Sequence, residues 1–255
     1  MIDHAVRYLP ILRLLKAAGG ANDAILELGS GSYGLGEYYS NSFVGCDVKF
    51  EEKPKPPMRP VVASAAELPF PDSSFDAVIA SDVLEHVHPN LRRDVLREAL
   101  RVSRKLVLVG FPCGSVAYAS DQRLFASCQE LGRAVPLWLE EHMQYPFPDE
   151  SIFQGLADEW TVQSIGNDNL YFRDWLIRRM IEGQRRWMLL FDFIERMPRP
   201  FMELALRLAD CGQCYRRIFA VTRAAGFARA GHCLVSARSP SDYLSEESGP
   251  GVARP

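Results

Sequence analysis

The chain has 255 residues, of which 47% are hydrophobic and 24% charged, a composition typical of a globular protein in aqueous surroundings. Its formal net charge of -3 argues against a nucleic-acid partner, and no apolar run approaches the roughly 20 residues that a membrane span needs. Six scattered cysteines with no secretory signal before them indicate a reduced, cytoplasmic protein. The single Cys211-Gly-Gln-Cys214 pair lacks further cysteine or histidine partners, so we expect no metal site.

The first elements predict a ligand-binding turn. Apolar residues recur over 2–18 as in a helix, which ends at two glycines, and a short apolar strand follows over 24–28. Gly29, Gly31 and Gly34 come directly after that strand. Because glycine has no Cβ, the backbone of this loop can approach a ligand closely, and a helix is expected to begin at about residue 36.

A second apolar strand, over residues 43–46, ends at Asp47. A carboxylate at the end of the second strand is well placed to accept hydrogen bonds from the hydroxyls of a ribose. The strand, glycine loop and acid therefore predict a nucleoside-cofactor site at the carboxyl edge of an α/β sheet. Gly29-x-Gly31-x-x-Gly34 also fits the dinucleotide pattern, so the loop alone does not identify the cofactor.

The next segment carries a family resemblance. Four prolines between residues 54 and 60 forbid a regular helix, and a short strand is expected at 61–62. Residues 67–87 then read ELPFPDSSFDAVIASDVLEHV. This run resembles the loop and fourth strand of class I S-adenosylmethionine-dependent methyltransferases, in particular their small-molecule branch. Together with the glycine loop and Asp47, the resemblance covers residues 2–112, and it makes a nicotinamide-dependent oxidoreductase the minor alternative.

The resemblance implies a doubly wound, seven-stranded Rossmann-like sheet and S-adenosyl-L-methionine as cofactor, with S-adenosyl-L-homocysteine as product. It also implies roles for matching positions: the glycine loop would hold the methionine part, Asp47 the ribose, and Val48 the adenine. The full set of cofactor-binding residues expected in this way is Glu27, Gly29, Ser30, Gly31, Asp47, Val48, Ser64, Ala65 and Ser81.

The chain departs from the family pattern at three places. Ser64 replaces a carboxylate that commonly accepts from the adenine amino group, and a hydroxyl accepts less strongly than a charged group. Tyr33 stands where many members have a third glycine, and the proline-rich loop replaces a helix. These departures leave open an alternative, a protein that binds S-adenosylmethionine or S-adenosylhomocysteine without transferring a methyl group.

The second half predicts the acceptor side. After a helix over 89–102 and a strand over 106–110, residues 115–160 read as an insertion with helices over 121–131 and 150–159. Its aromatic residues and its place after a strand predict that it covers the acceptor. The segment WLEEH is similar to methyltransferases of bacterial surface-polysaccharide clusters, which implies a glycan acceptor beside the small-molecule one, and O-methylation.

The remaining elements are strands over 161–166 and 232–238, separated by a helical insertion over 169–230 with one long helix at 170–197 and another from 201. Residues 170–230 contain twelve arginines against six acids. This excess predicts either a solvated basic face or a surface that attracts an anionic partner, a membrane surface or a second subunit. We therefore expect one domain over 1–238 and a disordered tail over 239–255.

Two histidines are candidates for catalysis. A sulfonium methyl is already an activated electrophile, so the protein must chiefly align the acceptor and exclude water. A hydroxyl acceptor also benefits from a base. His86 follows the fourth strand and His142 lies in the insertion, so both are candidate general bases.

Overall fold

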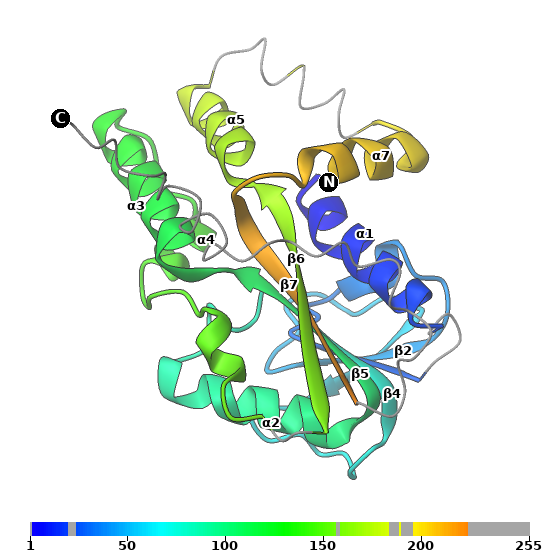
Figure 1. Ribbon diagram of the computed structural model, residues 1–255. Coiled ribbons are helices and arrows are strands. Elements are labelled where there is room, and N and C mark those ends of the chain that lie inside the picture. The colour runs from blue at the N-terminus through cyan, green and yellow to red at the C-terminus, as the bar shows by residue number, and fades with distance from the viewer. Residues whose placement is uncertain (1, 20–23, 157–158, 184–188, 190–195, 224–255) are drawn as a thin grey trace, which may run out of the picture.

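The computed structural model describes residues 2–19, 24–156, 159–183, 189 and 196–223. They form one seven-stranded sheet with helices on both faces (Figure 1). This architecture confirms the predicted doubly wound α/β fold. None of the helices in the described part of the chain has both the length and the apolarity to cross a lipid bilayer.

The strand order is β3-β2-β1-β4-β5-β7-β6, and β7 runs antiparallel to both of its neighbours while the other pairings are parallel. The order reverses between β1 and β4, where the carboxyl ends of strands in open α/β sheets usually leave room for a ligand. The strands are β1 (Ile25–Leu28), β2 (Phe43–Asp47), β3 (Met58–Val62), β4 (Phe75–Ser81), β5 (Ser103–Pro112), β6 (Trp160–Asn169) and β7 (Cys214–Arg223).

Two apolar layers hold the sheet between helices. Along β4, Ala77 and Ile79 pack in the layer that contains α1, whereas Val78 and Ala80 pack in the layer that contains α2. Successive side chains of a strand point to opposite faces, so a continuous apolar strand supplies both layers. The helices are α1 (Ile2–Ala17), α2 (Arg92–Val102), α3 (Gly114–Glu130), α4 (Leu137–His142), α5 (Leu170–Glu182) and α7 (Arg199–Ala209), with 3-10 turns η1 (Gly34–Glu37), η2 (Pro89–Leu91) and η3 (Glu150–Phe153).

Four helices gather at one end of the sheet. Helix α3 begins directly after β5, and α5 begins directly after β6, so both start at the edge where these strands end. Figure 1 shows α3, α4, α5 and α7 together at this end, at the top of the view. The carboxyl edge of the sheet is therefore covered by helices from the second half of the chain.

The seventh strand is not where the sequence predicted it. It is Cys214–Arg223, inserted between β5 and β6, whereas the predicted segment 232–238 lies outside the described residues. The helical insertion after β6 consequently ends before residue 214 and does not extend to 230. Arg216 and Arg217 belong to the arginine-rich range for which the sequence predicts a basic surface. Arg216 is nevertheless buried, because it forms an ion pair with Asp82 inside the protein.

Three predicted helices are shorter than expected. Within the range 170–197 predicted as one helix, α5 ends at Glu182, because Gly183 adopts a left-handed conformation with φ of 69°, and residues 184–188 and 190–195 lie outside the described part of the chain. The helix expected from residue 36 is only the turn η1, and the one over 150–159 is only η3. The helix predicted over 121–131 instead starts earlier, at Gly114.

Candidate active site

The glycine loop leaves β1 in a left-handed conformation. Gly29 has φ of 65° and its amide donates to the carbonyl of Cys46 over 2.8 Å, which attaches the loop to β2. A Cβ on Gly29 would lie 2.5 Å from the side chain of Val83, so this glycine is required by packing. Gly31, with φ of 52°, has no described heavy atom within 4 Å of the place of a Cβ. The backbone at Gly31 thus faces open space, as a loop that holds a ligand requires.

Asp47 lies beside this loop. Its Oδ2 accepts a hydrogen bond from the amide of Gly31 over 2.9 Å, and its Oδ1 accepts a longer one from the amide of Lys49 over 3.3 Å. The side chain is only half-buried. A carboxylate that is accessible and adjacent to open space can accept further hydrogen bonds from a ligand's hydroxyl groups.

Glu27 lies beneath the loop and is only 1% exposed. Its Oε2 accepts a hydrogen bond from the amide of Leu35 over 2.9 Å, while Oε1 has no hydrogen-bond partner among the described residues. Burial raises the pKa of Glu27 to about 7, although the bond from Leu35 opposes the shift. A half-satisfied buried acid next to the loop is suited to a positively charged group of a ligand.

The other expected cofactor residues differ in exposure. Ser30 and Ser81 are buried, Ala65 is half-buried, and Val48 is 69% exposed. Ser64 is exposed, and its hydroxyl accepts a hydrogen bond from the amide of Ala66 over 3.2 Å. The segment that contains Ser64 and Ala65 lies next to β2, because the amide of residue 63 donates to the carbonyl of residue 47 over 3.0 Å.

The loop after β4 carries a buried, paired carboxylate. Asp82 has φ of 53°, a conformation uncommon for a residue with a side chain. Nε and Nη2 of Arg216 in β7 donate hydrogen bonds to its two carboxylate oxygens, Oδ1 and Oδ2, over 2.8 and 2.7 Å. Arg7 of α1 adds an ion pair of 2.8 Å. Although burial opposes it, these two guanidinium groups hold the pKa of Asp82 below its usual value. Asp82 thus joins β4, β7 and α1 at one point.

The ion pairs continue from this point toward the helices of the carboxyl edge. Arg216 also contacts Asp168 at 3.4 Å, and Asp168 lies 3.6 Å from Arg173 of α5. Arg173 in turn contacts Asp121 of α3 at 3.0 Å, and both side chains are buried. This series of alternating charges therefore links the end of β4 to the insertion.

Asp121 orients His142. The Nδ1 atom of His142 lies 2.7 Å from Oδ2 of Asp121, and the hydroxyl of Tyr215 donates to the same oxygen over 2.6 Å. Burial alone would raise the pKa of Asp121, but its contacts with His142 and Arg173 hold it below the usual value. An ionised carboxylate at Nδ1 fixes the tautomer of the imidazole and leaves Nε2 free for chemistry.

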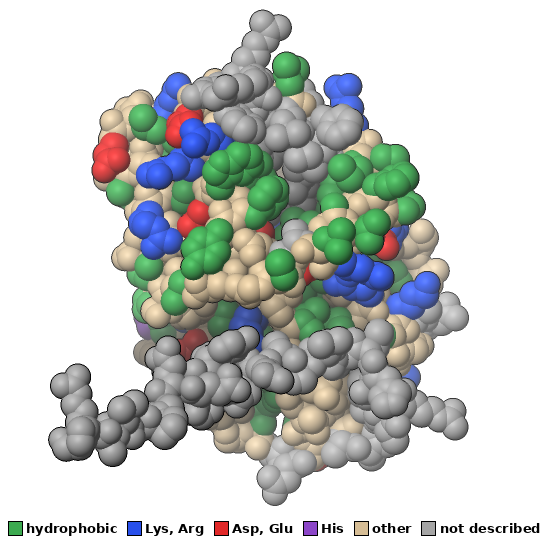
Figure 2. Space-filling view, turned by 45° about the horizontal axis from the view of Figure 1, so that its top comes forward, with side chains coloured by type: hydrophobic (Ala, Val, Ile, Leu, Met, Phe, Trp, Pro, Cys, Tyr) green, Lys and Arg blue, Asp and Glu red, His purple; other side chains and the backbone are tan. Residues whose placement is uncertain are grey.

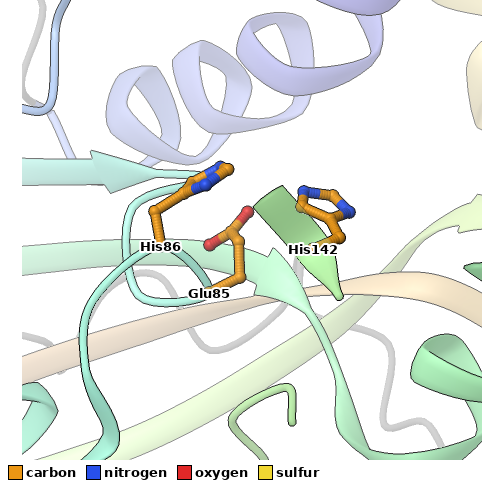
Figure 3. Close-up of side chains that lie close together, drawn as sticks. All are labelled: Glu85, His86 and His142. Atoms are coloured by element: carbon orange, nitrogen blue, oxygen red, sulfur yellow. The ribbon is translucent and has the colours of Figure 1, made fainter. Parts of the chain in front are cut away.

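His86 lies beside His142. The two rings have centroids 5.2 Å apart, and Figure 3 shows them on either side of the Glu85 carboxylate. Nδ1 of His86 lies 3.5 Å from the carboxylate of Glu141. Burial and the neighbouring His142 lower the pKa of His86, against the opposing effect of Glu141. The structure therefore brings together the two histidines that the sequence singled out separately.

The sequence analysis does not identify the other charged and polar residues around these two histidines. Burial and the neighbouring Asp82 raise the pKa of Glu85 well above its ordinary value, although Glu85 was not a candidate. Asp82 and Glu85 stand in the same segment as His86, so their position after a strand was an available signal. Asp121, Arg173 and Tyr215 come from three distant segments, and no motif connected them.

Part of the chain is similar in sequence to a known protein family, and its fold is similar to solved structures. Residues 26–108 match the family model described as "Methyltransferase domain". No curated protein gives a significant match. Among solved structures, the YcgJ protein from Bacillus subtilis is 17% identical with a TM-score of 0.50, covering 87% of this chain and 98% of its own.

Magnesium protoporphyrin IX methyltransferase from Synechocystis PCC 6803, solved with bound S-adenosylhomocysteine, is 10% identical with a TM-score of 0.50. That comparison covers 85% of this chain and 82% of the other. At such low identities the likeness establishes the fold, while the family match covers β1 to β5 and with them the glycine loop and Asp47. The strand order and the glycine loop agree with that match, so residues 26–108 form a methyltransferase domain in a chain with the fold of S-adenosylmethionine-dependent methyltransferases.

Proposed function

We propose that this methyltransferase methylates a hydroxyl group of a small molecule or glycan held at the carboxyl edge of the sheet. The observation that carries this proposal is the buried contact of 2.7 Å between His142 and Asp121, next to His86. An imidazole whose Nδ1 is held by a carboxylate is suited to remove a proton from a hydroxyl group through Nε2. Methylation of an amine or a thiolate has less need of such a pair.

The cofactor-binding residues of this proposal surround the glycine loop. Asp47 would accept hydrogen bonds from the ribose, and Glu27 would face the positively charged methionine end beneath Gly29, Ser30 and Gly31. Val48, Ser64 and Ala65 would border the adenine, and Ser81 would lie below it at the end of β4. Support comes from the open space at Gly31, the half-satisfied Glu27 and the proximity of residues 63 and 47.

The two halves of the proposed site are in contact. Val83, three residues before His86, occupies the space that a Cβ on Gly29 would need. The loop that carries His86 therefore lies directly against the loop proposed to hold the cofactor. In the reaction the acceptor oxygen forms a bond to the methyl carbon, the carbon–sulfur bond breaks, and its electron pair stays on sulfur. The hydroxyl proton leaves through the histidine pair.

Aromatic side chains of the insertion support a ring-shaped acceptor such as a sugar. Trp138 and Phe147 both contact the ring of His142 edge-on, with centroids 5.4 and 5.1 Å away. Trp138 is partly exposed, so it offers an apolar face next to the histidines. Flat apolar side chains around a few polar groups are typical of small-molecule sites. We therefore propose that residues 115–160 cover the acceptor.

His142→Ala provides the test. We expect turnover of an accepted substrate to fall about 100-fold or more, the usual contribution of a positioned base, while the affinity for S-adenosylhomocysteine stays within about twofold. His88→Ala is the matched control, because His88 is exposed, its Nδ1 accepts from the amide of Asn90, and its ring packs edge-on against Tyr145 rather than against His86 or His142. Unchanged turnover in His142→Ala would contradict the role of this histidine. If S-adenosylhomocysteine binds but no acceptor is methylated, the alternative of a binding protein without transfer is favoured.

A second partner, an anionic membrane surface, is suggested by α5 and α7. These helices expose large apolar side chains, and Figure 2 shows hydrophobic side chains gathered on this face together with basic ones. Exposed aromatic and aliphatic side chains beside arginines are typical of helices that lie in a membrane interface. The exposed apolar residues are Tyr171, Phe172, Trp175, Met180, Phe201, Leu204 and Leu208, and the exposed arginines of these helices are Arg178, Arg199 and Arg207.

A further inference from the structure

Glu85 carries a buried carboxyl group that no hydrogen bond satisfies among the described residues. It is 1% exposed, and neither of its oxygens has a hydrogen-bond partner among the described side chains and backbone groups that surround it. A buried charge normally requires pairing, because desolvation is costly. The other buried acids of the cluster, Asp82 and Asp121, meet this requirement through arginines. Glu85 is the exception, and its surroundings show what could satisfy it.

Two imidazoles face this carboxylate. One ligand atom from each of Glu85, His86 and His142 lies within 4.8 Å of the other two, and Figure 3 shows the carboxylate between the rings. A transition-metal ion with bonds of about 2.0–2.2 Å holds its ligands roughly 3.3 Å apart in a tetrahedral arrangement. The three atoms would need to close by about 1.5 Å at most, and His86, which lies in an exposed turn, is the least enclosed of the three residues.

The outer contacts of the histidines suit metal ligation. Nδ1 of His142 is engaged by Asp121, and Nδ1 of His86 lies closest to Glu141, so Nε2 of each ring is the nitrogen left for an ion. Metal-binding histidines usually donate their other nitrogen to a carboxylate in this way, which fixes the tautomer and strengthens the ligand. Asp121 is in turn held by Tyr215 and Arg173.

We propose that Glu85, His86 and His142 bind one divalent first-row transition-metal ion. Two imidazoles and one carboxylate suit zinc, iron or manganese, and three protein ligands leave positions for water or for an acceptor oxygen. This inference rests on the proposed function for its consequence: a hydroxyl bound to the ion would lose its proton to water more easily, so the same two histidines would activate the acceptor through the ion they hold. The sequence predicted no metal site, because residue 142 is far along the chain from residues 85 and 86.

Metal binding is tested directly with the full chain. After dialysis against a chelator, Co²⁺ is titrated while visible absorption is followed, and Mn²⁺ is titrated by electron paramagnetic resonance. We expect one ion per chain and visible bands of nitrogen-coordinated Co²⁺. Glu85→Gln and His86→Ala should each weaken binding at least tenfold, since loss even of an outer contact typically has that effect. His88→Ala is the control and should bind as the parent does.

Two further measurements distinguish loss of the metal site from loss of the fold or of the cofactor site. Glu85→Gln keeps the volume of the side chain and replaces a carboxyl group that has no hydrogen-bond partner among the described residues, so its thermal midpoint should not fall, and circular dichroism would check this. Affinity for S-adenosylhomocysteine, measured without metal, should be the same in parent and variant. Failure of both metals to bind, or equal binding by Glu85→Gln, would overturn the metal site while the proposed methylation stands. Metal binding without any affinity for S-adenosylhomocysteine would instead overturn the proposed cofactor site.

Discussion

The carboxylate of Asp47 accepts a hydrogen bond from the amide of Gly31 over 2.9 Å, and this bond joins the end of β2 to the loop that follows β1. The two groups proposed to hold opposite parts of the cofactor are thereby in contact before any ligand binds. The loop is held in an open conformation by an acid that has further lone pairs to offer.

Asp47→Ala should weaken binding of S-adenosylhomocysteine by about 1.5–3 kcal/mol, the usual contribution of hydrogen bonds to a charged group. The loss has two sources, the ribose contact and the support of the loop. Isothermal titration calorimetry would measure it. Asp47→Asn keeps one acceptor oxygen and should lose less. Equal affinity of the alanine variant and the parent would remove Asp47 from the site.

Gly31→Val should abolish cofactor binding while the protein stays folded. A Cβ at this position meets no described atom within 4 Å, so the cost to folding is the strain of φ at 52°, about 1–2 kcal/mol. Gly34→Ala is the contrasting variant, because its Cβ would lie 2.1 Å from Oε2 of Glu27. It should lower the thermal midpoint more. Calorimetric binding and thermal denaturation separate the two effects, and normal binding by Gly31→Val would show that the ligand lies elsewhere.

Glu27 should make stability fall as pH rises toward neutrality. Its pKa of about 7 in the folded protein lies above its usual value of 4.5, so below pH 4.5 the acid is protonated in both states and costs nothing. Between these values only the unfolded state ionises, and stability should drop by roughly 3 kcal/mol before levelling above pH 7. Glu27→Gln should lack this drop. Urea denaturation of parent and variant from pH 4.5 to 8 would check it, and parallel profiles would contradict the assignment.

Arg216→Gln should destabilise the fold by about 3–5 kcal/mol, because it leaves the buried carboxylate of Asp82 short of a partner. Arg217→Gln, one residue along β7, is the matched control. Its guanidinium pairs with Glu150 near the surface, so its loss should cost at most about 1 kcal/mol. Chemical denaturation of both variants provides the measurement. Similar losses for the two arginines would mean that the buried pair is not important for stability.

Binding to anionic liposomes should depend on the aromatic face of α5. Trp175→Ser and Phe172→Ser should reduce co-sedimentation with vesicles of anionic lipid, and high salt should weaken binding by the parent. Vesicles of neutral lipid are the control. Absence of binding by the parent at low salt would exclude the membrane partner and leave these side chains to another function.

The first half of the fold could be predicted because its signals are local. Strands β1, β2 and β4 are short apolar runs bounded by glycine, proline or acids. The three glycines after β1 adopt positive φ angles, which residues with a side chain rarely do. The second half could not, because its decisive contacts join distant segments. Arg216 lies in a strand only because Asp82, over a hundred residues earlier, neutralises it. From sequence such an arginine cannot be distinguished from one on the surface.

The same applies to the candidate site. Residue type and position identify His86 and His142 as candidates. The feature that distinguishes Glu85, a buried carboxyl group without a hydrogen-bond partner among the described residues, is visible only in the folded structure. Helix α5 departs from the ordinary rule, since Arg173 is buried while Tyr171, Phe172 and Trp175 are exposed. Hydrophobic periodicity would expose this arginine, because it does not include Asp121 of α3, with which the arginine pairs.

The position of β7 has a consequence for the order in which the protein assembles. The last strand of the described chain lies between β5 and β6, so neither can pair with its final neighbour until residues 214–223 have left the ribosome. Until then β5 presents an unpaired edge to other chains. Arg216 is part of that strand, so its ion pair with Asp82 can form only when β7 is in place. The central sheet and the polar cluster at its carboxyl edge are therefore completed in the same step, after the other six described strands have been synthesised.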